Sequence, residues 1–131
     1  DFGGRSNGWD RYRLRIPARK MINGASKIYI IYPDYYKGKF DPDDVEVKTY
    51  KSKKKKESVE LEEVIWDKEN YFIEIVLKEP ILANNKVEVV LSNVKNPPFG
   101  GTFYFDCQVL AADDIPIREY LGTWILTIGG R

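Results

Sequence analysis

The chain contains no histidine and only one cysteine, Cys107. Histidine is the commonest general base, the commonest metal ligand and the usual partner of a serine or cysteine nucleophile, so hydrolysis by a catalytic triad is excluded. A lone cysteine excludes an intramolecular disulfide and makes no metal site by itself. Cys107 also shares the parity of Phe105 and Val109, which indicates a small buried side chain. We therefore expect a domain without catalytic residues, metal or cofactor.

The chain also lacks an excess of basic residues and a long apolar run. Lys and Arg number 21 against 20 Asp and Glu, a formal net charge of +1, whereas domains that hold nucleic acid by its phosphates usually carry a marked basic excess. The longest apolar run, Ile28–Tyr32, falls far short of the roughly 18 residues that span a bilayer. We expect neither a nucleic-acid partner nor a membrane span. The first residues also lack the basic and apolar regions of a signal peptide, so we expect a processed end whose targeting segment is missing.

Apolar and polar side chains alternate at short intervals along the chain, which is typical of an all-β sandwich or barrel. The expected strands are residues 12–16, 27–32, 45–49, 59–66, 71–77, 87–91, 103–109 and 124–128. Turn residues such as Asn23-Gly24 separate them, and a change of parity predicts a bulge near Glu62-Glu63. We predict a single immunoglobulin-like antiparallel β-sandwich of about seven to eight strands over residues 11–131, after an extended N-terminal arm at residues 1–10.

A run of four lysines, Lys53, Lys54, Lys55 and Lys56, lies between two expected strands and predicts a basic hairpin tip. It is a candidate contact for an anionic surface, either an acidic protein or charged lipid, strong enough to localise the domain but not to anchor it. The alternative interpretation is a solvated loop whose charge discourages edge-to-edge association of strands.

Three arginines, Arg11, Arg13 and Arg15, alternate along one expected strand and share one of its faces. Guanidinium groups suit bidentate contacts with carboxylates, and arginine is enriched at protein interfaces. We interpret this face as a candidate partner-binding surface. The alternative is a polar face that pairs with glutamates on a neighbouring strand.

Aromatic residues exceed what one small core needs, because the chain has three Trp, nine Tyr and six Phe. Trp9 precedes the first expected strand, and Tyr35, Tyr36 and Phe99 fall in irregular stretches, where aromatic side chains often anchor interfaces. These four residues are further candidates for partner binding. The competing use is a stacking platform for a saccharide or another small ligand, made of Tyr35, Tyr36 and Phe99.

The most specific stretch reads N-P-P-F-G-G-T-F-Y-F from Asn96 to Phe105 and is followed by Tyr120-Leu121-Gly122. Together with Ile16-Pro17 and the Phe40-Asp41-Pro42 turn upstream, it resembles an uncharacterised family of small β-domains from cyanobacteria, with related sequences in algal plastids. The likeness spans most of the chain. The Lys-rich hairpin and the Gly-rich N-terminal segment depart from that family.

The resemblance implies a photosynthetic lineage and a plastid location. Small plastid β-domains without an active site commonly serve as peripheral subunits of thylakoid complexes. We therefore expect a non-catalytic accessory subunit of a photosynthetic membrane complex, with photosystem I favoured. It would contact protein subunits at the thylakoid surface, on the stromal rather than the lumenal side, and would touch the membrane without spanning it. A free-standing binding module for a saccharide or other small ligand is the alternative.

Overall fold

The computed structural model describes residues 2–52, 55–112 and 117–129. These residues form ten strands and two short 3-10 helices and contain no α-helix, which confirms the all-β prediction. The elements are β1 (Phe2–Arg5), β2 (Trp9–Ile16), η1 (Ala18–Lys20), β3 (Ala25–Ile31), η2 (Pro42–Asp44), β4 (Val45–Ser52), β5 (Lys55–Val59), β6 (Leu61–Asp67), β7 (Phe72–Ile81), β8 (Lys86–Lys95), β9 (Gly101–Leu110) and β10 (Arg118–Gly129).

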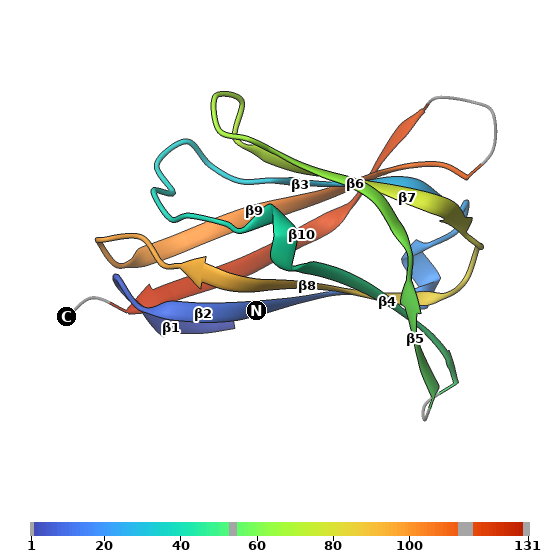
Figure 1. Cartoon of the computed structure of the whole chain (residues 1–131), viewed down its shortest axis with the longest axis horizontal. Coiled ribbons are helices and arrows are strands. Elements are labelled where there is room, and N and C mark those ends of the chain that lie inside the picture. The colour runs from blue at the N-terminus through green and yellow to red at the C-terminus, as the bar shows by residue number, and fades with distance from the viewer. Residues whose placement is uncertain (1, 53–54, 113–116, 130–131) are drawn as a thin grey trace.

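The strands form two sheets that pack face to face (Figure 1). One sheet has six strands in the order β1-β10-β9-β3-β7-β6, and the other has four in the order β2-β8-β4-β5. Neighbouring strands pair antiparallel except β1, which runs parallel to β10. The predicted β-sandwich is confirmed, with more strands than expected and one parallel pair.

The N-terminal segment differs from the expected extended arm. Residues 2–5 form β1 at the edge of the six-stranded sheet, with Phe2 opposite Leu126 in the register, and β2 already begins at Trp9. The segment is therefore part of the sandwich. The glycines of Gly3-Gly4 break any alternation of side chains, so the pattern of the sequence does not reveal this strand.

Segment 59–66, expected as one strand, contributes to both sheets. β5 ends at Val59 in the four-stranded sheet and β6 begins at Leu61 in the six-stranded sheet, so the chain crosses between the sheets at Glu60. The predicted bulge is confirmed, because the register of β6 against β7 shifts between Leu61 and Glu63. Next to this crossing, the β4–β5 hairpin projects from the body of the sandwich (Figure 1).

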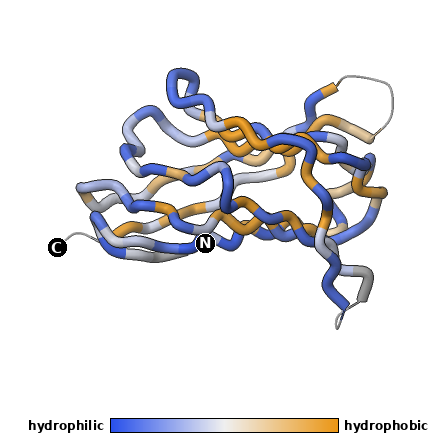
Figure 2. The backbone as a smooth tube through the Cα atoms, in the orientation of Figure 1, coloured by the Kyte–Doolittle hydropathy of each residue, from blue (hydrophilic) through white to orange (hydrophobic). Residues whose placement is uncertain are grey.

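Apolar side chains from both sheets fill the space between them, and the hydrophobic positions in Figure 2 run along the strands while the turns are mostly hydrophilic. The largest fully buried side chains are Tyr12, Leu14, Ile16, Met21, Ile28, Ile30, Ile73, Ile75, Leu91, Phe105, Leu126 and Ile128. Each buried aliphatic or aromatic side chain of this size contributes about 1.5–3 kcal/mol. Cys107 is buried among them as predicted, and its burial raises the pKa of the thiol to about 12.

The Asn-Pro-Pro corner after β8 is joined to the N-terminal turn by hydrogen bonds of Asn96. Asn96 is almost completely buried, and its amide donates to the carbonyl oxygen of Arg5 at 2.9 Å and to Asp10 Oδ2 at 3.2 Å. Its side-chain oxygen accepts a hydrogen bond from the Tyr12 hydroxyl, and its backbone N–H donates to the carbonyl of Gly8. One asparagine therefore joins β1, β2 and the β8–β9 corner at one end of the sandwich.

Candidate functional site

The outer face of the four-stranded sheet brings together cations from all four of its strands. Arg15 on β2 pairs in the register with Glu88 on β8, and Glu88 pairs on its other side with Lys48 on β4. One step along the sheet, Tyr50 pairs with Lys86 and Lys56. Side chains two residues apart on a strand share a face. We name the five cations of this surface the basic face: Arg13, Arg15, Lys48, Lys56 and Lys86.

A fully buried carboxylate, Glu88, lies among these cations. Its Oε2 is 3.2 Å from Arg15 Nε, and its Oε1 is 3.8 Å from Arg13 Nη1 and 3.4 Å from Lys56 Nζ. A carboxylate removed from water carries a penalty of several kcal/mol unless it is paired, so these contacts are what permit its burial. Because three cations meet one carboxylate, the cluster keeps two of its positive charges uncompensated.

Tyr50 connects this cluster to the β4–β5 hairpin. Its hydroxyl donates to Glu88 Oε1 at 3.4 Å, and its ring centroid lies 5.2 Å from Lys56 Nζ and 4.9 Å from Lys86 Nζ. Ammonium groups at this distance from a ring are attracted by its π-electrons. The pKa of Lys56 is raised, first by its hydrogen bond with Tyr50 and then by Glu88. The lysines next to Tyr50 therefore have defined positions on the sheet.

The three alternating arginines, Arg11, Arg13 and Arg15, do not make the same contacts. Arg13 and Arg15 pair with a glutamate on the adjacent strand, as the alternative interpretation of the sequence proposed. Arg11 lies at the other end of the sheet, where it lines a polar hollow of about 560 Å³ with Trp9 and Asp44. Trp9 is 68 % exposed, and its role in partner binding stays a prediction.

The lysine run joins the arginines in space. Lys53 and Lys54 lie outside the described residues, whereas Lys55 and Lys56 begin β5 and are exposed. Lys56 reaches back along the sheet to Glu88. The hairpin lysines and the three arginines are separate features of the sequence, because only the pairing of β4 with β5 and β8 brings them onto one surface.

The three aromatic residues of the expected platform do not lie together on the surface. Tyr35 is 57 % and Phe99 is 82 % exposed, but Tyr36 is only 2 % exposed. The Tyr36 ring packs edge-on against Phe105 at 5.0 Å, and its hydroxyl is 2.8 Å from that of Tyr12. The prediction that Tyr36 contacts a partner is therefore wrong. The loop after β3 folds back onto the core, which an irregular stretch of sequence does not reveal.

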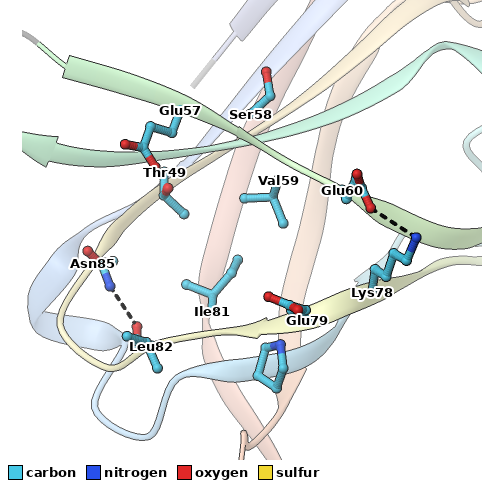
Figure 3. Close-up of a pocket in the computed structure, with 11 residues that line it drawn as sticks. Thr49, Glu57, Ser58, Val59, Glu60, Lys78, Glu79, Ile81, Leu82 and Asn85 are labelled. Carbon is cyan, nitrogen blue, oxygen red and sulfur yellow. Dashed lines mark hydrogen bonds and ion pairs between the residues drawn. The ribbon is translucent and has the colours of Figure 1, made fainter.

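A second hollow, of about 640 Å³, opens between the β4–β5 hairpin and the end of β7 (Figure 3). Val59 and Ile81 give it an apolar floor, while Glu57 and Glu79 line its sides. Its edge carries an ion pair between the Lys78 ammonium and the Glu60 carboxylate at 3.2 Å. No pattern in the sequence reveals this hollow, because it arises where the chain crosses between the sheets.

The part of the chain that the structure describes offers neither a metal-binding cluster nor a membrane-spanning helix. Among residues 2–52, 55–112 and 117–129, no cluster of three or more acidic, cysteine or histidine side chains is placed to hold a metal ion. Within the same part of the chain, no helix has the length and apolar character to cross a bilayer.

A family model matches residues 1–128. The chain belongs to the family described as Protein of unknown function (DUF2808). The resemblance to an uncharacterised family of small β-domains is confirmed to this extent, while the photosynthetic lineage of this DUF2808 domain stays a prediction. No curated protein matches the chain.

Solved structures with the same fold are similar to this DUF2808 domain at very low sequence identity. The collagen-binding subdomain of the Enterococcus faecalis surface protein ACE has a TM-score of 0.53 at 9% identity, over 96% of this chain and 92% of that one. The collagen-binding domain of Erysipelothrix rhusiopathiae RspB has 0.53 at 10%, over 89% and 40%. The group B streptococcus pilus 2b backbone protein has 0.52 at 9%, over 90% and 53%. These likenesses show an immunoglobulin-like sandwich, and neither they nor the family indicate a catalytic class.

Proposed function

We propose that this domain is a non-catalytic interaction module that docks through its basic face onto an acidic surface of a larger protein complex. The observation that carries the proposal is the Glu88 cluster, in which one buried carboxylate fixes Arg13, Arg15 and Lys56 on the open side of a sheet. The five cations share this face of the sheet with two carboxylates, the buried Glu88 and the exposed Glu46 on β4, so the face keeps an excess of three positive charges.

Fixed positions matter because exposed ion pairs are individually weak. Such a pair contributes about 0.2–1 kcal/mol, since two long side chains lose freedom when they meet. Arg13 and Arg15 are already held against Glu88, so less of this freedom remains to be lost on binding. Charge complementarity then orients the partner and speeds the encounter more than it adds affinity. A rigid cationic sheet face is therefore suited to selecting an acidic protein surface.

We propose a non-catalytic module because the chain lacks histidine and its one cysteine is buried. The chain has no histidine, and its single thiol is inside the core with a raised pKa. A buried thiol with such a pKa is a poor nucleophile, because the thiolate is the reactive form.

For the biological setting we propose a photosynthetic membrane complex, with photosystem I of an algal plastid favoured. The support is the resemblance carried by Asn96–Phe105, together with a small domain that offers binding surfaces. The domain would sit peripherally at the thylakoid surface, on the stromal side. In this arrangement the basic face meets acidic subunits, while Lys55 at the hairpin lies free to approach anionic lipid.

The saccharide alternative loses its main support, because burial of Tyr36 leaves Tyr35 and Phe99 without the third member of the platform. Collagen binding is stated for two of the structural neighbours, but 9–10% identity carries no binding property over to this chain. We therefore propose neither as the function.

The test is binding of the purified domain to isolated photosystem I particles, measured by co-sedimentation over a range of salt concentrations. We expect saturable binding that weakens as salt rises, because ions screen exposed charges over about 8 Å at physiological ionic strength. The quadruple variant Arg13→Gln, Arg15→Gln, Lys56→Gln, Glu88→Gln neutralises the cluster without leaving its carboxylate buried and unpaired. It should fail to bind while keeping the thermal stability of a folded domain.

Two further variants keep the test decisive. Lys48→Glu with Lys86→Glu reverses charge on the basic face and leaves the three cation contacts of Glu88 intact, so it should also abolish binding. Lys27→Gln with Lys68→Gln removes charge from β3 of the other sheet and from the turn that joins its strands β6 and β7, and it should bind as the wild type does. Full binding by both basic-face variants would overturn the proposed interface, and no binding of the wild type at low salt would overturn the proposed partner.

A further inference from the structure

A second cationic feature lies on the side of the sandwich where β2 and β10 face each other. β2 is the edge of the four-stranded sheet, and β1 covers β10 only from Leu126 onward, so the earlier part of β10 has a free edge beside β2. The indole N–H of Trp124 donates to the carbonyl oxygen of Arg15 at 2.9 Å and bridges the two sheets here. Next to this bridge is a cavity of about 200 Å³.

The cavity has an apolar floor and a cationic rim. Ile16, Cys107 and Leu121 contribute the floor, and all three are buried. The rim includes Arg19 and Lys20, which η1 places directly after β2, and none of the described residues that line the cavity is an aspartate or glutamate. An apolar floor lowers the local dielectric constant, so the attraction between a cation and a bound anion is stronger there than at an open surface.

The backbone of β10 is shaped to let Lys20 lie over this cavity. The register of β10 against β9 shifts between Tyr120 and Gly122, and Gly122 has a φ of 138°, a conformation that side chains other than glycine rarely adopt. A Cβ atom on Gly122 would lie 3.1 Å from Lys20 Nζ. The bare glycine backbone therefore leaves the space that the ammonium group occupies.

The cations beside the cavity differ in their ion pairs. Within the described part of the chain, neither Arg19 nor Lys20 forms an ion pair, whereas the Arg15 guanidinium is held by Glu88. Asp106, on the neighbouring strand β9, accepts a hydrogen bond from Thr123 Oγ1 at 2.7 Å. Arg19 and Lys20 therefore have no ion-pair partner among these residues, and the Asp106 carboxylate, which keeps its charge, contacts Thr123 of the cavity lining and not either cation.

We propose that this cavity is a binding site for a small oxyanion of the phosphate or sulfate class, held by Lys20 and Arg19 above the floor formed by Cys107 and Leu121. Its volume is below the 300 Å³ or so of pockets that take drug-sized ligands, which favours a single small group. Ammonium and guanidinium groups donate charge-assisted hydrogen bonds to such oxygens. The site adjoins the basic face, because Arg15 also lines the cavity, but its two principal cations are not part of that surface.

The test is an NMR titration of the isotope-labelled domain with inorganic phosphate, at an ionic strength held constant with sodium chloride. We expect saturable shifts of the Lys20 and Gly122 amides and of the Trp124 indole N–H. The double variant Arg19→Gln, Lys20→Gln should raise the apparent Kd at least about tenfold, because each lost charge-assisted bond is worth roughly a factor of ten. Lys86→Gln on the basic face should leave the Kd unchanged.

The same titration with sulfate separates the oxyanion class from phosphate alone, and saturable shifts with sulfate would support the wider class. Shifts that rise linearly with phosphate, or that the double variant retains in full, would overturn the site. The double variant should also keep the docking on photosystem I particles described above, so a failure of the oxyanion site and a failure of the docking proposal are distinguishable.

Discussion

Replacing Asn96 by alanine tests how the most specific part of the sequence holds the fold together. The change removes a buried amide that donates to Arg5 and Asp10 and accepts from the Tyr12 hydroxyl. Each hydrogen bond of this kind contributes about 0.5–1.5 kcal/mol, and a buried group left without a partner costs about 1–3 kcal/mol. The Tyr12 hydroxyl keeps its bond with Tyr36, and the Asp10 carboxylate is close enough to the surface to regain water.

We therefore expect a loss of about 3 kcal/mol in the free energy of unfolding, most of it from the Arg5 carbonyl and the Tyr12 contact. For a domain of this size that corresponds to a fall in Tm of roughly 10 °C. Urea unfolding followed by circular dichroism measures the change. The control is Asn85→Ala, which loses a single hydrogen bond to the Leu82 carbonyl and should cost less than about 1 kcal/mol. A loss below about 1 kcal/mol for Asn96→Ala would refute the reasoning.

The isosteric variant Asn96→Asp separates hydrogen bonding from shape. Its new carboxyl group would face Asp10 and the Arg5 carbonyl oxygen, both acceptors, so its pKa in the folded protein would be raised. A raised pKa means that the folded state favours the protonated form. The penalty relative to wild type should therefore be smallest below about pH 4 and should grow as pH rises toward neutrality. A penalty that does not change with pH would contradict the assigned contacts.

Three further predictions follow from positions inside the sandwich. Gly24→Ala should lower the free energy of unfolding by about 2 kcal/mol or more, because Gly24 has a φ of 66° and a Cβ atom there would lie 2.3 Å from the Ile81 carbonyl oxygen. Urea unfolding measures this loss. An unchanged free energy of unfolding would contradict the geometry. The Cys107 thiol should resist a thiol-specific reagent at pH 8 until the domain is unfolded, since burial raises its pKa to about 12; rapid labelling of the native domain would contradict its burial. Burial raises the pKa of both Tyr12 and Tyr36 above 10, so their contribution to stability is complete below about pH 10 and is lost as pH rises further. Thermal unfolding above pH 10 should therefore show a Tm that falls with pH. Tyr36→Phe should weaken this fall in Tm.

Much of the sandwich could be predicted from alternation, because period-two patterning is strong wherever one side of a strand faces the core. The burial of Cys107 and the bulge before Glu63 both follow from parity alone. The strand β1 could not be predicted, since its Gly-Gly sequence has no alternation and its partner, β10, lies at the far end of the chain.

The candidate site was less accessible to sequence reasoning. Glu88 occupies an outward position in a strand, where an exposed side chain is the natural expectation, yet cations from two other strands cover it completely. Its burial depends on the order of strands within the sheet, which no local pattern specifies. Tyr36 illustrates the opposite case, because a residue in an irregular stretch is buried when its loop folds back onto the core.

The measurement that tests the central claim most directly is co-migration in the native membrane. Following the proposed setting, photosynthetic membranes that contain the chain are solubilised gently, the complexes are separated on a native gel, and the chain is located by mass spectrometry. We predict that it runs with a chlorophyll-containing complex, photosystem I in particular, and that the quadruple variant of Arg13, Arg15, Lys56 and Glu88 runs alone at about the mass of the free domain. A wild-type chain that runs alone would contradict the proposal that this domain serves by docking on such a complex.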